Sequence, residues 1–190
     1  MMKFRLALLA LLVALPAQAR DFDSSVSESA QIVQLRPDFK VPEEPNQLFY
    51  VQRSPNANTV VYAAKLDGQG DFDSREPVEA FWRKFNIDGS KQSLNFFERM
   101  MAYGVKLNAR KKGEAVSFSI AALPQRKLTL GWDAQHHPQA TMAIDSHPVK
   151  LAYVYLHVVE GGLLPKVPVL DIFGTDLASG KAIHEHLIQR

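Results

Sequence analysis

Two histidines near the C-terminal end of the chain, His184 and His186, are spaced so that they could hold one metal ion. Side chains two residues apart on a β-strand point to the same side of the sheet, which would present both imidazoles together. A catalytic zinc ion needs three protein ligands and an open position, and this spacing supplies only two ligands. We therefore interpret the pair as solvated strand histidines, with a zinc site and a metal-dependent hydrolase as the minority alternative. His157 lies inside an apolar run and is expected to be a hydrogen-bonded core histidine.

A second group of chemically capable residues lies in the first half of the chain, where aromatic and charged side chains interrupt apolar segments. An arginine that faces an aromatic-lined interior must be paired or must contact an anionic group, because an unpaired buried charge is costly. One interpretation is a pocket with stacking walls and an arginine for a carboxylate or phosphate. The other is a structural network that pairs Arg53 or Arg83 with Glu98. The candidate ligand-binding residues are Tyr50, Arg53, Asn58, Tyr62, Trp82, Arg83, Glu98 and Tyr103.

Signals for other catalytic chemistry are weak. The chain contains no cysteine and no Gly-x-Ser-x-Gly nucleophile motif. It also lacks a glycine-rich phosphate-binding loop. We therefore predict no catalytic residue and no cofactor other than the minority zinc, and a non-enzymatic role is favoured.

The elements that would position these residues are short β-strands. Apolar and polar residues alternate with a period of two in most segments, which is typical of strands with one buried and one solvent-facing side. About ten strands at close spacing with one helix predict a mainly β fold, either an antiparallel β-barrel or a curved sandwich. Residues 149–159 are apolar on both sides and predict a central strand. The other expected strands are 48–53, 59–66, 78–85, 103–110, 116–122, 128–134, 140–144, 167–174 and 181–188.

The predicted helix begins after Asn95. The Asn95 side chain can accept a hydrogen bond from the first turn, and Glu98 can reach back to the Asn95 backbone, which is a capping box. Gly104 is placed to end the helix. The apolar side that would pack on the core comprises Phe96, Phe97, Met100 and Met101.

The first 19 residues have the features of a secretory signal peptide. Lys3 and Arg5 precede an apolar run that is too short to span a bilayer, and Ala17-Gln18-Ala19 fits a signal peptidase site. We therefore expect cleavage after Ala19 and an exported protein, either periplasmic or secreted, with no integral membrane segment after cleavage. Residues 20–45 are expected to be a mobile leader or an extended arm, and residues 46–190 a single β-rich domain.

The charge balance argues against nucleic acid as a partner. The whole chain has 22 basic and 20 acidic residues, and two of the basic residues belong to the signal peptide. The exported chain is therefore close to neutral and has no long-range field that would attract nucleic acid. The lack of cysteine also excludes disulfides and a lipid-attachment cysteine, so the core alone must hold the domain together.

Four motifs carry a resemblance to a known family. They are FYVQRSPNANTVVYAAKL, PVEAFWRKFNIDG, LNxxERxxAYG and DIFGTDLASGKAIHEH. In this order the chain resembles a family of exported bacterial proteins that is known as domain of unknown function 4833, over about residues 46–186. The resemblance implies a single envelope domain and no particular activity. It marks as signature positions Arg53, Asn56, Asn58, Tyr62, Trp82, Glu98, Tyr103 and Gly104.

These observations lead to two hypotheses about the function of the chain. The first is a non-enzymatic periplasmic binding module for a small amphipathic or anionic ligand. The second is a structural or interaction domain that docks another envelope protein, for example by strand addition.

Overall fold

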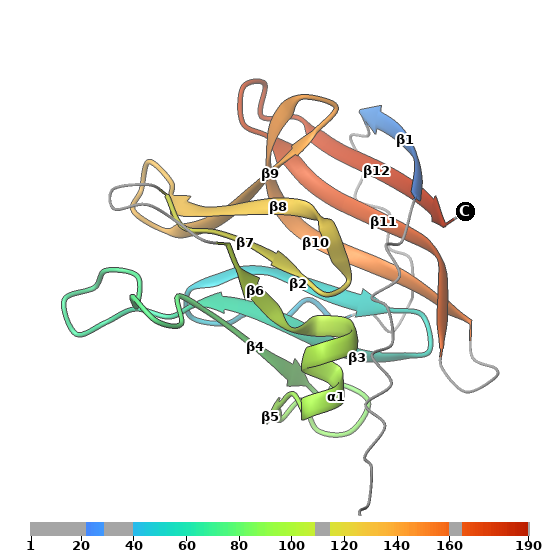
Figure 1. Cartoon of the computed structure of the whole chain (residues 1–190), viewed down its shortest axis with the longest axis horizontal. Coiled ribbons are helices and arrows are strands. Elements are labelled where there is room, and N and C mark those ends of the chain that lie inside the picture. The colour runs from blue at the N-terminus through green and yellow to red at the C-terminus, as the bar shows by residue number, and fades with distance from the viewer. Residues whose placement is uncertain (1–21, 29–39, 109–114, 160–164, 190) are drawn as a thin grey trace, which may run out of the picture.

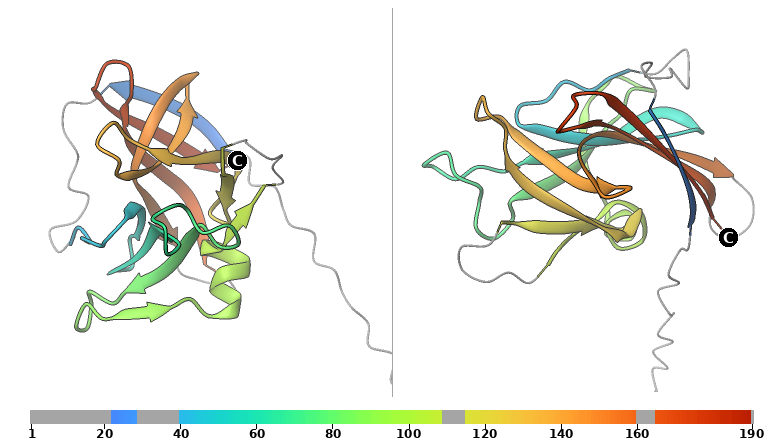
Figure 2. Two further views of the ribbon diagram at one scale, coloured as in Figure 1. Left: turned by 90° about the vertical axis from the view of Figure 1, so that its left-hand side faces the viewer. Right: turned by 90° about the horizontal axis from the view of Figure 1, so that it is seen from above.

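The described residues form one curled sheet. The computed structural model describes residues 22–28, 40–108, 115–159 and 165–189. These residues form a sheet of twelve strands that curls into a half-barrel, with a short helical segment beside it (Figure 1, Figure 2). The predicted mainly β class with one short helix is confirmed. The strands are β1 (Phe22–Glu28), β2 (Gln47–Arg53), β3 (Asn56–Ala64), β4 (Val78–Arg83), β5 (Lys91–Ser93), β6 (Val105–Leu107), β7 (Ser117–Ile120), β8 (Leu123–Trp132), β9 (Pro138–Ile144), β10 (His147–Val159), β11 (Lys166–Asp176) and β12 (Ala182–Gln189).

The strand order is β5-β4-β3-β2-β10-β9-β8-β7-β6. In addition, β11 pairs with β10, β12 pairs with β11, and β1 pairs with β12. β10 is central, as predicted: it pairs with β9 through its first residues, with β2 through its middle and with β11 along most of its length. The pairing of β2 with β10 is parallel, whereas the alternation alone suggested only antiparallel neighbours. The short strand β5 was not predicted, because its sequence Lys-Gln-Ser has no apolar position.

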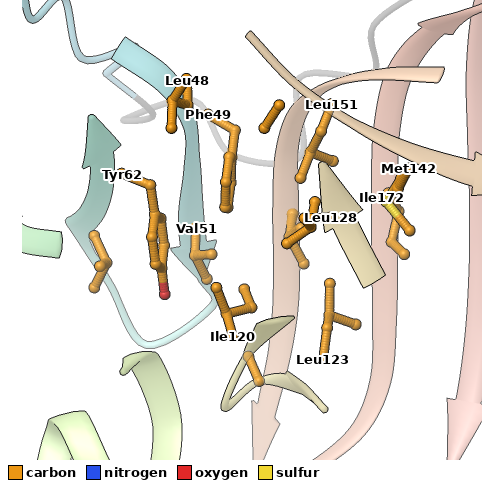
Figure 3. Close-up of a cluster of buried hydrophobic side chains, with 14 of the residues drawn as sticks. Leu48, Phe49, Val51, Tyr62, Ile120, Leu123, Leu128, Met142, Leu151 and Ile172 are labelled. Carbon is orange, nitrogen blue, oxygen red and sulfur yellow. The ribbon is translucent and has the colours of Figure 1, made fainter. Parts of the chain in front are cut away.

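The main core fills the inside of the curl. Large side chains from β2, β3, β8, β10 and β11 meet there (Figure 3). Phe49 and Tyr62 stack with ring centroids 4.4 Å apart, and both side chains are almost fully buried. Burying one such side chain contributes about 1.5–3 kcal/mol, which explains how a chain without disulfides is held together. A smaller cluster on the other face of the sheet contains Tyr50, Val61, Ala63, Phe81, Tyr153, Tyr155 and Phe173.

The helical segment consists of α1 (Phe96–Glu98) and a π-helical turn, η1 (Arg99–Tyr103). The predicted capping box is present: Asn95 Oδ1 accepts from the Glu98 backbone N–H at 2.9 Å, and Glu98 Oε2 accepts from the Asn95 N–H at 2.8 Å. The segment ends at Gly104, whose backbone is extended, and only glycine fits there because a Cβ atom would lie 2.0 Å from the carbonyl oxygen of Arg99.

The prediction that this helix buries its apolar side is wrong. All four apolar side chains are exposed, and the two phenylalanines are about 70% exposed. The helix is too short to lay a continuous side on the core, and only Tyr103, at its end, is buried. The exposed side chains are Phe96, Phe97, Met100 and Met101.

The N-terminal region is described only in part. Residues 22–28 form β1, which pairs antiparallel with β12 at the edge of the sheet. The predicted signal peptide, residues 1–19, and residues 29–39 of the predicted leader lie outside the described residues. Among the helices that the structure describes, none has the length and apolar character needed to cross a bilayer.

Candidate functional site

A groove lies where the two ends of the curled sheet approach each other. β4 and β5 form one end and β6 the other, and the helical segment connects β5 to β6 (Figure 1). The curl brings β6 against β4. Between them is a cavity of about 560 Å³, which we call the seam groove. It is lined by residues of β4, β5, β6 and both helical turns.

The strand pairing leaves one wall of the seam groove uncovered. β4 pairs with β3 along its whole length, but β5 covers only Phe81–Arg83. Val78, Glu79 and Ala80 therefore have no strand beside them on the groove side within the described part of the chain. The hydrophobic wall of the groove includes Val78, Phe81, Leu94, Val105 and Leu107.

Charged residues of the groove are unevenly paired. Glu76 accepts from Lys65 Nζ at 2.7 Å, and Glu79 accepts from Lys91 Nζ at 3.0 Å. The other two charged lining residues, Arg75 and Arg99, form no ion pair with any residue that the structure describes. Arg99 Nε donates only to the backbone carbonyl of Leu94, at 3.1 Å. The carboxylates of Glu76 and Glu79 are therefore neutralised, whereas the guanidinium groups of Arg75 and Arg99 remain without an ion pair to a described residue.

Four of the predicted ligand-binding residues do come together, but inside the core. The Tyr62 hydroxyl donates to the Tyr103 carbonyl at 2.8 Å. Tyr103 meets the ring of Trp82 edge-on at 5.1 Å, and the Arg53 guanidinium lies 5.4 Å from the Trp82 ring. Burial raises the pKa of Tyr103, although the charge and hydrogen bond of Arg53 act in the opposite direction. The three aromatic residues of this group belong to the main core.

The remaining predicted residues lie apart from that cluster. Arg83 donates to both carboxylate oxygens of Glu44, with Nη2 and Oε2 2.7 Å apart, and to the Gly89 carbonyl at 3.1 Å. Glu98 caps the helix, so the expected pairing of Glu98 with Arg53 or Arg83 does not form. Asn58 Oδ1 accepts from the Asn86 N–H at 3.1 Å in a turn. Tyr50 lies on the opposite face of the sheet, stacked on Tyr153.

The two histidines of β12 share a face, as their spacing predicted, and the structure adds a partner from β11. Asp171 Oδ1 lies 2.7 Å from His184 Nε2 and 2.7 Å from His186 Nδ1. Asp171 Oδ2 lies 2.6 Å from His157 Nε2. His157 is hydrogen-bonded as predicted, but its side chain is 40% exposed, so its assignment to the core is wrong.

Sequence reasoning missed Asp171, which is the centre of this arrangement. An acidic residue inside the apolar run Val-Pro-Val-Leu-Asp-Ile-Phe was the available signal. The Asp171 side chain is 5% exposed. Burial alone would raise the pKa of Asp171, but hydrogen bonds from His186, His184 and His157 outweigh that effect and hold the pKa below its usual range.

Comparison with protein families gives one match. A family model described as domain of unknown function DUF4833 matches residues 49–186. The chain belongs to the DUF4833 family. Comparisons with curated proteins and with solved structures returned no match. The matched range of this DUF4833 domain contains the seam groove and the histidines around Asp171.

Proposed function

We propose that this DUF4833 domain is a non-enzymatic binding module that holds a small amphipathic anion in the seam groove. The observation that carries the proposal is the pair of arginines, Arg75 and Arg99, which form no ion pair with a described residue and line the groove beside its apolar wall. Guanidinium groups bind carboxylate or phosphate through charge-assisted hydrogen bonds. The groove volume of about 560 Å³ is also in the ordinary range for small-molecule sites.

The apolar part of the ligand follows from the groove walls. Among the lining residues, Phe81 and Leu94 are buried, and Phe96 and Met100 are exposed. A hydrocarbon chain placed there would gain about 0.8 kcal/mol for each CH₂ group removed from water. The Lys91 ammonium group, which pairs with Glu79, lies 3.7 Å from the centre of the Phe81 ring, so its charge beside this apolar side chain is already balanced.

The location of this function is part of the proposal. The signal-peptide pattern of residues 1–19 supports export, so we place the binding module in a bacterial periplasm or outside the cell. A ligand in that compartment would be a small organic carboxylate or phosphate with an alkyl or aryl portion.

The test is a calorimetric titration of the purified chain with decanoate, decanol and decyltrimethylammonium, which share one alkyl chain and differ in charge. We expect decanoate to bind most tightly. The double variant Arg75→Gln/Arg99→Gln should weaken decanoate binding by at least about 10-fold, because a charge-assisted hydrogen bond contributes about 1.5–3 kcal/mol. Lys127→Gln removes an exposed charge on β8, outside the groove lining, and should have no effect. Equal binding of the cationic and anionic ligands would contradict the proposal.

A second candidate function is docking of an envelope protein. The observation that favours it is the exposed apolar surface of the helical segment, where Phe97 and Met101 lie outside the groove lining. The double variant Phe97→Ser/Met101→Ser separates the two functions. It should leave decanoate binding unchanged if the groove holds the ligand, and it should abolish association with a partner protein if this surface is the docking site.

A further inference from the structure

We propose that Asp171, His184 and His186 form a binding site for one divalent transition-metal ion. Each residue offers one ligand atom, and the three atoms all lie within 4.8 Å of one another. The site is separate from the seam groove, whose lining contains none of these residues. It also contains the third ligand that the spacing of the two histidines alone did not supply.

The register of the sheet creates this arrangement. β11 and β12 are antiparallel, with Asp171 directly opposite His186 and Phe173 directly opposite His184. Residues 171 and 173 therefore point to the same face as residues 184 and 186. A slip of one residue would turn either set to the other face of the sheet. Gly174 helps to fix the position of β11, because a Cβ atom there would lie 2.4 Å from Val149 Cγ1 on β10.

Stacked rings hold His184 in place. Its imidazole lies parallel to the Phe173 ring at 4.5 Å, Phe173 stacks on Tyr153 at 4.4 Å, and Tyr153 stacks on Tyr50 at 5.2 Å. This row crosses four adjacent strands, β12, β11, β10 and β2. A ligand whose ring is already fixed loses little conformational freedom when a metal binds, which is the condition that a preorganised metal site must meet.

The chemistry of the three groups selects the kind of metal. Two imidazoles and one carboxylate suit zinc and its first-row neighbours and can leave positions open for water or another ligand. Calcium and magnesium prefer sites made of oxygen atoms, so two imidazoles disfavour them.

His157 contacts the Asp171 carboxylate but is not one of the three proposed metal ligands. Its Nε2 contacts the Asp171 oxygen that the other two histidines do not use. Tyr155 meets the His157 ring edge-on at 4.9 Å. His157 is therefore a positioning residue that orients the carboxylate, in the way that outer-shell partners orient metal ligands.

The test is a titration of the purified chain, prepared without a histidine tag and stripped with a chelator, with Zn²⁺ by calorimetry and with Co²⁺ by visible absorption. We expect one ion per chain for each metal and no binding of Mg²⁺. His157→Gln should weaken Zn²⁺ binding by roughly 10–100-fold, which is typical for loss of an outer-shell partner. His184→Gln/His186→Gln should weaken it further and should abolish the Co²⁺ absorption band.

A matched control removes two histidines that do not contact Asp171. His137 and His147 lie in exposed positions near Asp133 and Asp176, and His137→Gln/His147→Gln should bind Zn²⁺ like the unchanged chain. If the cluster variants do not fold, thermal unfolding of the unchanged chain still tests the site, because a metal that binds only the folded state must raise Tm. Absence of saturable one-to-one binding, or equal loss in the control variant, would show that the three histidines only hydrogen-bond to the carboxylate and would overturn the proposal.

Discussion

The Tyr62 hydroxyl donates a hydrogen bond to the backbone carbonyl of Tyr103 at 2.8 Å, and this bond ties β3 to the end of η1. Tyr62 is fully buried, and burial raises its pKa well above the usual value. The bond matters for the seam groove because Gly104 and Val105, which line it, directly follow Tyr103. The core thus fixes the position of one groove wall.

The first prediction concerns this bond. Tyr62→Phe keeps the ring that stacks on Phe49 but leaves the Tyr103 carbonyl without its donor. We expect a loss of about 1–3 kcal/mol in the free energy of unfolding, because an unsatisfied buried acceptor costs that much. Urea denaturation followed by tryptophan fluorescence measures it, and an unchanged midpoint would show that this bond does not anchor the groove wall.

The second prediction concerns the end of the helical segment. Gly104→Ala would place a Cβ atom 2.0 Å from the Arg99 carbonyl oxygen, so the backbone must shift. We expect a destabilisation of about 1–3 kcal/mol, the usual range for overpacking, together with weaker decanoate binding. Gly131→Ala is the matched control, because a Cβ atom there meets nothing within 4 Å. If both variants lose the same stability, steric crowding is not the reason for glycine at position 104.

The sequence predicts local features well because they depend on neighbouring residues. Alternation located most strands, and Asn95 and Glu98 form the capping box that their spacing indicated. The failures concern packing between distant segments. Arg83 pairs with Glu44, 39 residues away, and no local pattern connects them. The exposed side chains of Phe96 and Met100 belong to a helix that is periodic but too short to reach the core.

The same contrast between local spacing and packing of distant segments applies to the two candidate sites. The shared face of His184 and His186 could be predicted from the period of a strand. The contribution of Asp171 depends on the register of β11 against β12, which is set by the whole hairpin. The seam groove could not be predicted, because it depends on how far the sheet curls and on which edge of β4 remains uncovered.

The third prediction concerns a buried charge on the core side of β12. Glu185 is 2% exposed, and its Oε1 accepts a hydrogen bond from Arg126 Nη2 on β8. Removing one partner of a buried ion pair leaves an uncompensated charge and typically costs about 3–5 kcal/mol. Arg126 is partly exposed, so we expect Arg126→Met to cost about 3 kcal/mol in urea denaturation.

A second substitution checks the explanation. In the double variant Arg126→Met/Glu185→Leu no buried charge remains, and an apolar replacement of a buried pair is often neutral. We therefore expect much of the lost stability to return. If the double variant is as unstable as the sum of the two single variants, the two side chains do not interact energetically, and the loss must come from packing.

The fourth prediction concerns the dependence of stability on pH at the β11–β12 turn. Hydrogen bonds from the Ser179 N–H at 2.6 Å and the Ser179 hydroxyl at 2.8 Å, and then from the Ala178 N–H, hold the pKa of Asp176 below its ordinary value of 3.8. A carboxyl whose pKa is lower in the folded than in the unfolded state stabilises the fold when ionised. This stabilisation is fully present above pH 3.8 and is lost as the pH falls through the lower, folded-state pKa.

Asp176→Asn removes the charge but keeps a carbonyl oxygen in place. We expect the variant to have a lower urea midpoint than the unchanged chain at neutral pH, and we expect the difference to shrink as the pH falls below 3.8, because the unchanged chain then loses the same charge. Asp71→Asn is the control, since the Asp71 side chain is exposed and accepts no hydrogen bond from a described residue. A difference at Asp176→Asn that stays constant across this pH range would mean that turn geometry, and not the charge of the carboxylate, stabilises the hairpin that carries both histidines of the proposed metal site.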